Sequence, residues 1–350
     1  MKRNFVIIMA VLITAFIGCS KFDSETTLQN SIEKAAVRIN DAANDISATK
    51  GYELLTVTVE PGKTGEGFRD SIDLDMIAGI YDFSPYRDLY HWCPFPVRFF
   101  KKTGESDSLI VRMPSTMAFH PRYLYEYIFK ESATGNNFTV TASDYHYYYS
   151  LYNKQDYHLH ADFNLEGEDV GSLEMMMIAE DNIHRNHFSK YEFTDGYSLE
   201  VEKKRDDDTS FVSFALIDDE GILLKETKIF SGNRMNDDFE RTYILTIGNV
   251  DIIRSSEFDS VQVWLDGVLQ SNAAARIIDE SDTAGTICYR RDILLTFDDG
   301  TTANLSEMIK PGMEILRTLV DSLHSMTFTK GVVDFIALNI YYHEFKLPRE

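Results

Sequence analysis

The alternation of apolar and polar residues changes its period along this chain, and the change separates a helical start from a long series of strands. Over 26–49, apolar residues recur at spacings of four and three, which places them on one stripe of a helix, with Gly51 positioned to end it. Beyond that helix the dominant period is two, which is typical of β-strands with one buried face. The stretches with this period are 52–60, 109–114, 137–149, 157–166, 172–180, 197–204, 211–218, 222–230, 242–253, 260–270, 292–297 and 332–345.

A second helix is predicted at about 311–326, among the last strands. Pro311 stands near its start, where the missing N–H of proline costs little, and Leu316, Leu319, Leu323 and Met326 form its apolar stripe. The polar segment 231–240, SGNRMNDDFE, is the best candidate for a domain boundary. We therefore expect a mainly β, α+β protein with two antiparallel, sandwich-like β-rich domains, at 26–232 with the N-terminal helix and at 241–350 with the second helix.

Short turns containing Asp and Gly connect several of the predicted strands. Four segments share one layout, in which an apolar strand is followed by an Asp with a Gly within two residues and then by a second strand. These segments are FTDGYSL (193–199), LIDDEGIL (216–223), WLDGVLQ (264–270) and TFDDGTT (296–302). Asp-Gly between strands is a strong hairpin signal because glycine accepts positive φ without steric cost. All four segments are therefore predicted to be turns.

The letters TFDDG (296–300) also resemble the start of the catalytic domain of metal-dependent polysaccharide deacetylases. In that family the paired aspartates supply a general base and a metal ligand, and a His-x-x-x-His stretch supplies further ligands. The chain after Gly300 is too short for that barrel, and His324 and His343 do not have the spacing. We interpret Asp298-Asp299-Gly300 as one more turn.

The N-terminal sequence predicts where in the cell the protein is located. Lys2 and Arg3 precede an apolar run at 5–17 that is too short for a stable membrane span, and Gly18-Cys19-Ser20 follows. This arrangement resembles the signal peptide and lipobox of bacterial lipoproteins, with Phe16 in place of the usual Leu. The resemblance implies removal of a signal peptide at 1–18, a tether at 19–25, and a Cys19 carrying acyl chains such as palmitate.

The same resemblance places the protein in the outer membrane, held by membrane lipid through its acylated N-terminus. Ser20 after the cysteine fits outer-membrane sorting. Asp23 and Glu25 are similar to the acidic export signal of surface lipoproteins in the Bacteroidota. Whether the protein faces the cell surface or the periplasm stays open.

Charge and composition narrow the function classes. The 350 residues include 34 Lys and Arg against 56 Asp and Glu, a formal net charge of −22, and removal of Lys2 and Arg3 makes the mature chain more acidic still. Such a charge disfavours nucleic acid as a partner and argues against flat docking on anionic lipid. With 19 Tyr, 23 Phe and only 8 Pro, the chain has the composition of a folded protein with large aromatic cores.

Two cysteines remain besides Cys19. In an oxidising envelope Cys93 and Cys288 could pair, but they lie far apart in the chain and in different predicted domains. We favour two separate buried thiols and leave their pairing open.

A histidine-rich strand is the candidate for metal binding. His158, His160 and Asp162 alternate, so they project from one face of a strand, about 7 Å apart in steps of two. The string resembles the His-x-His-x-Asp of metallo-hydrolases, although Phe163 stands where the metallo-β-lactamase pattern continues with His. The opposite face of the strand is continuously apolar, so an amphipathic strand with a wet polar face explains the pattern without zinc.

A run of tyrosines is the candidate for sugar binding. In DYHYYYSLYNKQDY (144–157), exposed rings at Tyr145, Tyr147, Tyr149 and Tyr152 would suit stacking on a glycan. The same residues also fit a half-buried pleated sheet, which we favour. A glycan-binding surface requires the rings to be exposed in a row.

The remaining motifs do not assemble a catalytic site. The sequence contains no Gly-x-Ser-x-Gly elbow and no glycine-rich phosphate loop, and it suggests no cofactor. The leading hypothesis is therefore an envelope-anchored lipoprotein with a non-catalytic binding or structural role. The alternatives are a surface glycan-binding protein, a fimbrillin-like assembly subunit and a metallo-hydrolase; a glycan or an envelope protein would be the partner.

Overall fold

The structure is a computed structural model. The residues that it describes are 27–56, 71–87, 97–116, 135–150, 154–181, 183–233, 238–258, 260–280, 290–309, 312, 315, 318–319 and 326–346. The signal peptide, the lipobox with Cys19, and both Cys93 and Cys288 lie outside these residues.

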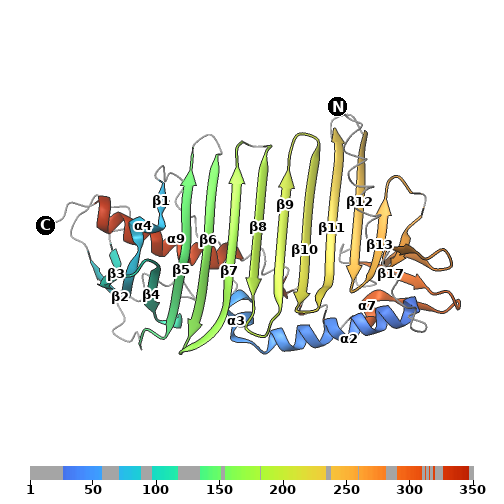
Figure 1. Ribbon diagram of the computed structural model, residues 1–350, viewed down its shortest axis with the longest axis horizontal. Helices are drawn as coiled ribbons and strands as arrows, with labels where there is room; N and C mark the ends of the chain where they lie inside the picture. The colour runs from blue at the N-terminus through green and yellow to red at the C-terminus, as the bar shows by residue number, and fades with distance from the viewer. Residues whose placement is uncertain are drawn as a thin grey trace, which may run out of the picture.

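One large sheet of 15 strands dominates the molecule (Figure 1). Its centre is an antiparallel meander in which each strand pairs with the next along the chain. The strands of this meander are β5 (Phe138–Tyr149), β6 (Gln155–Leu165), β7 (Glu168–Ala179), β8 (Arg185–Glu192), β9 (Ser198–Arg205), β10 (Thr209–Asp218), β11 (Gly221–Asn233), β12 (Asp238–Ile247) and β13 (Val250–Ser255).

Shorter strands complete both ends of this sheet. Beyond β13 lie β14 (Gln262–Leu265) and β15 (Val268–Leu269), and beyond β5 lie β4 (Leu109–Met113), β2 (Gly79–Arg87) and β3 (Val97–Gly104). The pairing of β2 with β4 is parallel, whereas the other pairs are antiparallel. A two-residue strand, β1 (Ile72–Asp73), also pairs with β5. A separate sheet contains β16 (Ala274–Glu280), β17 (Arg290–Thr296) and β18 (Thr302–Asn304).

The segment predicted to divide two domains is instead part of a hairpin within the large sheet. Ser231 pairs with Glu240, and the pairing of β11 with β12 continues to Asn233 and Asp238. The mainly β character with few helices is confirmed. The domain boundary at 231–240 is wrong because a polar hairpin tip and a polar linker have the same composition, and only strand pairing distinguishes them.

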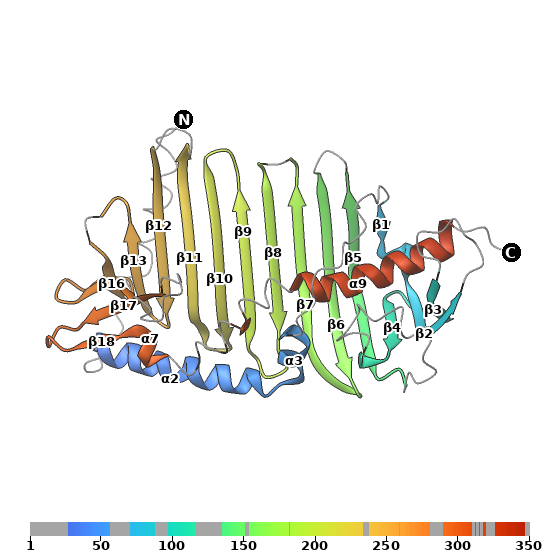
Figure 2. The ribbon, with the colours of Figure 1, turned by 180° about the vertical axis from the view of Figure 1, so that it is seen from behind.

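The two faces of the sheet differ in what lies on them. We call the face seen in Figure 2 the covered face, because α9 (Met326–Tyr341) and the small sheet lie against it. We call the face seen in Figure 1 the open face, because no described helix or strand crosses it between β6 and β12. Paired residues on neighbouring antiparallel strands project to the same face, so the register assigns each side chain to one of the two faces.

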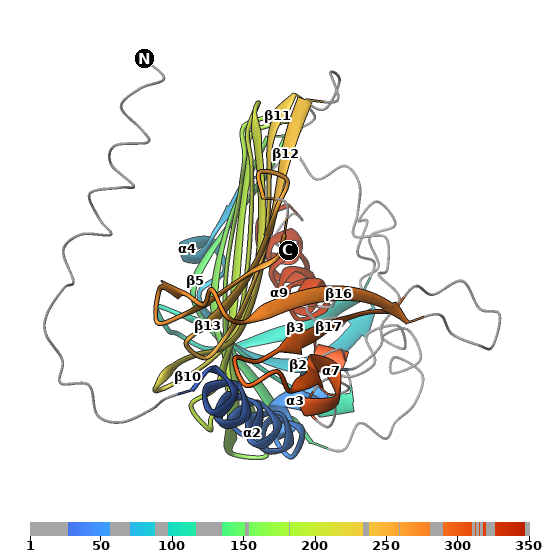
Figure 3. The same cartoon turned by 90° about the vertical axis from the view of Figure 1, so that its right-hand side faces the viewer.

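The predicted N-terminal helix is confirmed as α2 (Leu28–Ser47), which runs along the strand ends at the lower edge of the sheet (Figures 1 and 3). Its buried stripe contains the predicted Leu28, Ile32, Ala35, Ile39, Ala42 and Ile46. Thr27 caps the N-terminus by accepting a hydrogen bond from the Asn30 backbone N–H. An ion pair between Arg38 and Asp218, 2.5 Å apart, holds α2 to the end of β10.

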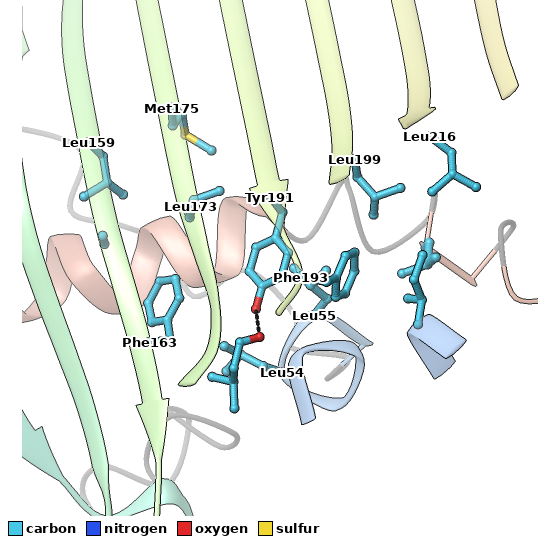
Figure 4. Close-up of a cluster of buried hydrophobic side chains, with 14 of the residues drawn as sticks. Leu54, Leu55, Leu159, Phe163, Leu173, Met175, Tyr191, Phe193, Leu199 and Leu216 are labelled. Carbon is cyan, nitrogen blue, oxygen red and sulfur yellow. Dashed lines mark hydrogen bonds between the residues drawn. The ribbon is translucent and has the colours of Figure 1, made fainter. Parts of the chain in front are cut away.

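Gly51 does not end α2; it lies inside the next helix, α3 (Lys50–Thr56), where it permits close packing. A Cβ at Gly51 would lie 2.4 Å from the carbonyl oxygen of Val170. Because glycine has no side chain there, α3 approaches β7 closely and buries Leu54 and Leu55 beside Tyr191 (Figure 4). The Tyr191 hydroxyl donates to the Val170 oxygen at 3.2 Å.

Two predicted strands are helices in the structure. The stretch 332–345 belongs to α9 and to the π-helical turn η2 (Tyr342–Lys346) that follows it, and 52–56 belongs to α3. In α9 the side chains of Val333, Ile336, Ala337 and Ile340 are all buried. A helix buried on most sides has a nearly continuous apolar sequence, which periodicity cannot distinguish from a buried strand. The predicted helix at 311–326 falls largely outside the described residues.

The Asp-Gly segments are turns, as predicted. Gly196, Gly221, Gly267 and Gly300 all have positive φ, and Asp266 accompanies Gly267 with φ 49°. Two stretches predicted as single strands are each divided by a turn that contains a glycine with positive φ. Gly248 separates β12 from β13, and Asp266-Gly267 separates β14 from β15. The short helices α4 (Leu74–Ile77) and α7 (Leu305–Met308) complete the described elements.

The ends of β8–β12 far from α2 have no described layer on either face (Figures 2 and 3). We call this part the distal half of the sheet. Long charged side chains two residues apart pair along its strands and cover the sheet surface: Lys204 with Glu202, and Lys228 with Glu226 at 2.6 Å. Such contacts replace part of the missing core, because the methylene stems of lysine bury apolar surface.

Candidate functional site

The open face of β5–β8 gathers histidine, aromatic and aliphatic side chains on a flat surface. The register places His146 opposite His158, and Met176 between His158 and Phe188. The neighbouring row contains Tyr148, Asp156 and Ile178. We call Tyr148, His146, His158, Met176, Ile178 and Phe188 the open-face strip.

Two histidines and two aspartates form the polar end of this strip. The Nδ1 atom of His146 lies 2.5 Å from an oxygen of Asp73, which β1 holds beside β5. The Nε2 atom of His158 lies 3.0 Å from Asp156, and the two imidazole rings meet edge to face with centroids 6.2 Å apart. Each carboxylate contacts a ring nitrogen and so orients its ring, which leaves the histidines as fixed polar groups on the surface.

The rest of the strip is apolar and partly exposed. Tyr148 and Ile178 are each 36% exposed, and Met176 and Phe188 are half-buried. Asn186 lies opposite Ile178, and its side-chain oxygen accepts no hydrogen bond. Flat apolar surface bordered by fixed hydrogen-bonding groups is suited to binding, and no described element encloses it as a catalytic cleft would require.

The predicted metal candidates do not converge. His158, His160 and Asp162 project from the open face in successive steps along β6, as the alternation predicted. His160 lies opposite Asp144 and Glu174, one step along the strand from the His146–His158 pair. The described residues contain no group of three or more His, Cys, Asp or Glu side chains arranged to hold a metal ion. The geometry therefore gives no support to a zinc hydrolase.

The tyrosines do not form the exposed row that the glycan-binding alternative requires, because Tyr145 and Tyr147 project from the covered face. Tyr145 is 2% exposed and donates to Asp334 of α9 at 3.2 Å, and Tyr157 donates to the same oxygen at 3.0 Å. Burial raises the pKa of Tyr145 well above its usual value, and the charge of Asp334 adds to this effect. Tyr147 is half-buried and Tyr149 is 38% exposed, while Tyr152 lies outside the described residues.

Alternation assigned these rings to one face without showing that α9 packs on it. The face opposite to the predicted tyrosines, with Tyr148 and His146, is the one left open. The pairing of β5 with β6 brings His146 beside His158. The sequence offered one signal for this contact, because the predicted strands 137–149 and 157–166 are consecutive and could form a hairpin.

Two other arrangements that suggest catalysis are structural. Asp299 accepts hydrogen bonds from the backbone N–H and the hydroxyl of Thr301, at 2.8 and 2.6 Å, which lowers the pKa of Asp299 and closes the turn. Ser189 Oγ lies 2.8 Å from His187 Nε2, but Ser189 is 1% exposed. A nucleophilic serine must reach its substrate, so this contact is a buried hydrogen bond.

Comparison with known proteins gave no match, either to a protein-family model, to a curated protein or to a solved structure. None of the described helices combines the length and the apolar character that crossing a membrane requires.

Proposed function

We propose that this chain is a lipid-anchored protein of the bacterial envelope that acts as a non-catalytic binding module, with the open face of its sheet as the binding surface. The observation that carries the binding role is the open-face strip: partly exposed apolar side chains lie on a rigid antiparallel meander beside oriented histidines. The Gly-Cys-Ser motif at 18–20 after an apolar run supports the anchor.

The lipid anchor is tested by intact mass analysis of the full chain produced in a Gram-negative host. We expect the mature protein to begin at Cys19, to carry acyl chains and to fractionate with membranes. Cys19→Ala is the matched control, and it should remain unprocessed by the lipoprotein pathway. A wild-type protein with an unmodified Cys19, or with an intact leader in the soluble fraction, contradicts the proposal.

A neutral glycan is the ligand class that the open-face strip supports best. Tyr148 and Phe188 offer ring faces for sugar C–H groups, and His158 and Asp156, whose side chains are 39% and 49% exposed, offer hydrogen-bonding atoms on the same surface. Stacking on aromatic rings supplies affinity while polar groups set orientation, and a flat surface accommodates a chain of sugars rather than a single buried one.

Binding of the full chain in detergent micelles to an array of neutral oligosaccharides tests this ligand class. Loss of one stacking ring costs about 1 kcal/mol, so Tyr148→Ala should weaken binding roughly five- to tenfold. Val268→Ala, which removes an exposed apolar side chain from β15, is the matched control and should leave binding unchanged. Equal binding by both variants would exclude Tyr148 from the site.

A further inference from the structure

A second surface, on the covered face, has the opposite character from the protein as a whole. In the distal half of the sheet and on the adjoining end of β13, the register and the exposure of the side chains place a group of basic residues on this face. Figures 2 and 3 show the strands that carry them. We call this group the basic surface; it consists of Arg185, Lys203, Arg205, Lys228, Arg241 and Arg254.

The strand register arranges these side chains in two adjacent rows. In one row Lys203 on β9, Lys228 on β11 and Arg254 on β13 occupy alternate strands, with Val212 and Tyr243 between them. Strands are about 4.8 Å apart, so successive charges in this row lie about 10 Å apart. The row nearer the strand tips contains Arg185, Arg205, Phe230 and Arg241.

Charge is segregated between the two faces of these strands. From β8 to β13, the described register places two acidic side chains on the covered face: Glu226, and Asp218 at the end of β10 next to α2, where it pairs with Arg38. Glu192, Glu200, Glu202, Glu240 and Asp251 all lie on the open face. This contrast arises in a protein whose formal net charge is −22. A random distribution of an acidic composition does not leave one face basic, so the segregation indicates a function.

Three of the basic side chains have no carboxylate partner within the described ranges. Lys203, Arg205 and Arg254 form no ion pair there, whereas Lys228 contacts Glu226 at 2.6 Å. Arg205 also lies directly opposite Arg185 on the neighbouring strand. A bound anion would give the three side chains a partner of opposite charge.

We propose that the basic surface binds a linear anionic polysaccharide lying across strands β8–β13. An extended sugar chain with one acidic group per disaccharide presents negative charges at a spacing comparable to that of Lys203, Lys228 and Arg254. Tyr243 and Phe230 are half-buried within the rows and add aromatic surface between those charges, with Lys228 Nζ 6.0 Å from the centre of the Tyr243 ring. This site goes beyond the open-face proposal, because its residues lie on the opposite side of the sheet.

The shape and charge of the surroundings favour a polysaccharide over a membrane or nucleic acid. Figure 3 shows α9 and β16 projecting from the same side of the sheet below this surface, so a planar bilayer cannot lie flat against it. Duplex DNA carries about one charge per 1.7 Å, which is far denser than the spacing of about 10 Å between successive basic side chains in a row. Acidic turns border the rows at the strand tips, where Asp181 and Asp207 contact His184 at 2.8 and 3.6 Å.

The test uses hyaluronan oligosaccharides, which carry one carboxylate per disaccharide, and the full chain in detergent micelles. Calorimetry should show binding that weakens by roughly tenfold or more between about 50 and about 200 mM salt. Lys203→Glu/Arg254→Glu should reduce the affinity at low salt by at least about tenfold. The matched control is Lys204→Glu/Lys225→Glu, which changes the net charge equally but on the open face, and its affinity should stay within about twofold of wild type.

Three outcomes would overturn the proposal: no binding of hyaluronan by the wild-type chain, equal losses in the two double variants, or tighter binding to duplex DNA or to anionic vesicles than to hyaluronan. Circular dichroism establishes that each variant is folded. If the Glu variant is unfolded, Lys203→Gln/Arg254→Gln replaces it, with Lys204→Gln/Lys225→Gln as its control. Failure of Tyr148→Ala to alter neutral-glycan binding leaves this test unaffected, since the two sites share no residue.

Discussion

Asp334 is a buried carboxylate that ties α9 to the sheet. It is 4% exposed, and a single oxygen accepts hydrogen bonds from Tyr145 and Tyr157. A buried charge is tolerated only when hydrogen-bond donors replace the water that it has lost, and the two phenols are such donors. The pKa of Tyr157 is raised well above its usual value, first by burial and then by the charge of Asp334, so both hydroxyls keep their protons.

Replacing Asp334 should therefore destabilise the protein strongly. Asp334→Ala leaves both phenol groups without this acceptor, and we expect the free energy of unfolding to fall by about 3–5 kcal/mol in urea denaturation. Asp334→Asn retains an acceptor oxygen and should cost less. Asp298→Ala, in an exposed turn, is the control and should stay within about 0.5 kcal/mol of wild type. Equal losses for Asp334→Ala and Asp298→Ala would contradict this role.

The turn between β7 and β8 should respond to pH through His184. Its hydrogen bond with Asp181 and the charge of that carboxylate raise the pKa of His184 above its ordinary 6.5, and Asp181 in turn has its pKa lowered to about 2. The stabilisation from this contact is therefore fully present between the ordinary pKa values of the two groups, 3.8 for Asp181 and 6.5 for His184. It is lost as pH rises through the raised pKa of His184 or falls through the lowered pKa of Asp181.

An NMR titration of the histidine ring resonances measures this effect. Asp181→Asn should lower the pKa of His184 toward 6.5, whereas Asp144→Asn, beside His160, should leave the pKa of His184 unchanged. An identical pKa of His184 in the wild-type protein and Asp181→Asn would show that this contact does not form in solution.

At the scale of elements, two glycines in helices should respond oppositely to alanine. A Cβ at Gly51 in α3 would lie 2.4 Å from the Val170 oxygen, whereas a Cβ at Gly331 in α9 would meet nothing within 4 Å. We expect Gly51→Ala to lower the free energy of unfolding by about 1–3 kcal/mol through overpacking. Gly331→Ala should raise it by up to about 1 kcal/mol, because alanine favours helix. Thermal denaturation of both variants checks the sign, and a stabilising Gly51→Ala would refute the close packing of α3.

The central strands were predictable from sequence because two signals agreed. Period-two alternation marked β5, β6, β7, β9, β10 and β11, and Asp-Gly pairs marked turns whose glycines need positive φ. The strand β8 was missed, because its sequence RNHFSKYE is mostly polar or half-buried on both sides. The helix α9 was predicted as a strand because its β-branched and aromatic residues have a high propensity for β-structure. Its packing against the sheet stabilises the helical conformation instead.

The candidate site was only partly predictable for a related reason. Alternation correctly put His158 and His160 on one face of β6, but it could not show which face a distant helix covers. The contact of Asp334 with Tyr145 joins positions 189 residues apart in the sequence, and it determines that the tyrosines are buried. The basic surface could not be predicted without the pairing of β8 through β13, since its members come from five different strands.

For the molecule as a whole, the uneven covering of the sheet should produce uneven stability. The half of β9–β11 near α2 packs Leu199, Leu216 and Leu224 into the core, while the distal half is held mainly by cross-strand hydrogen bonds and surface side chains. Local opening costs less free energy where little apolar surface is buried.

Hydrogen exchange measured by mass spectrometry tests this expectation within single strands. After correction for intrinsic rates, amides at 203–205 should exchange faster than those at 198–200, although both groups belong to β9. The comparison is internal, so differences in protein concentration or buffer cannot produce it. Uniform protection along β9 would show that the distal half is as stable as the covered half.

The position of α2 determines how the molecule would stand on a bilayer if Cys19 carries the proposed acyl chains. The helix follows the lower edge of the sheet and begins at Leu28, so the chain from Cys19 to that point spans at most about 30 Å. This short tether would keep the lower edge of the sheet next to the lipid headgroups. The opposite ends of the strands would then point away from the membrane. Both faces of the sheet would then be accessible to polysaccharides, the open face to neutral glycans and the covered face to anionic ones.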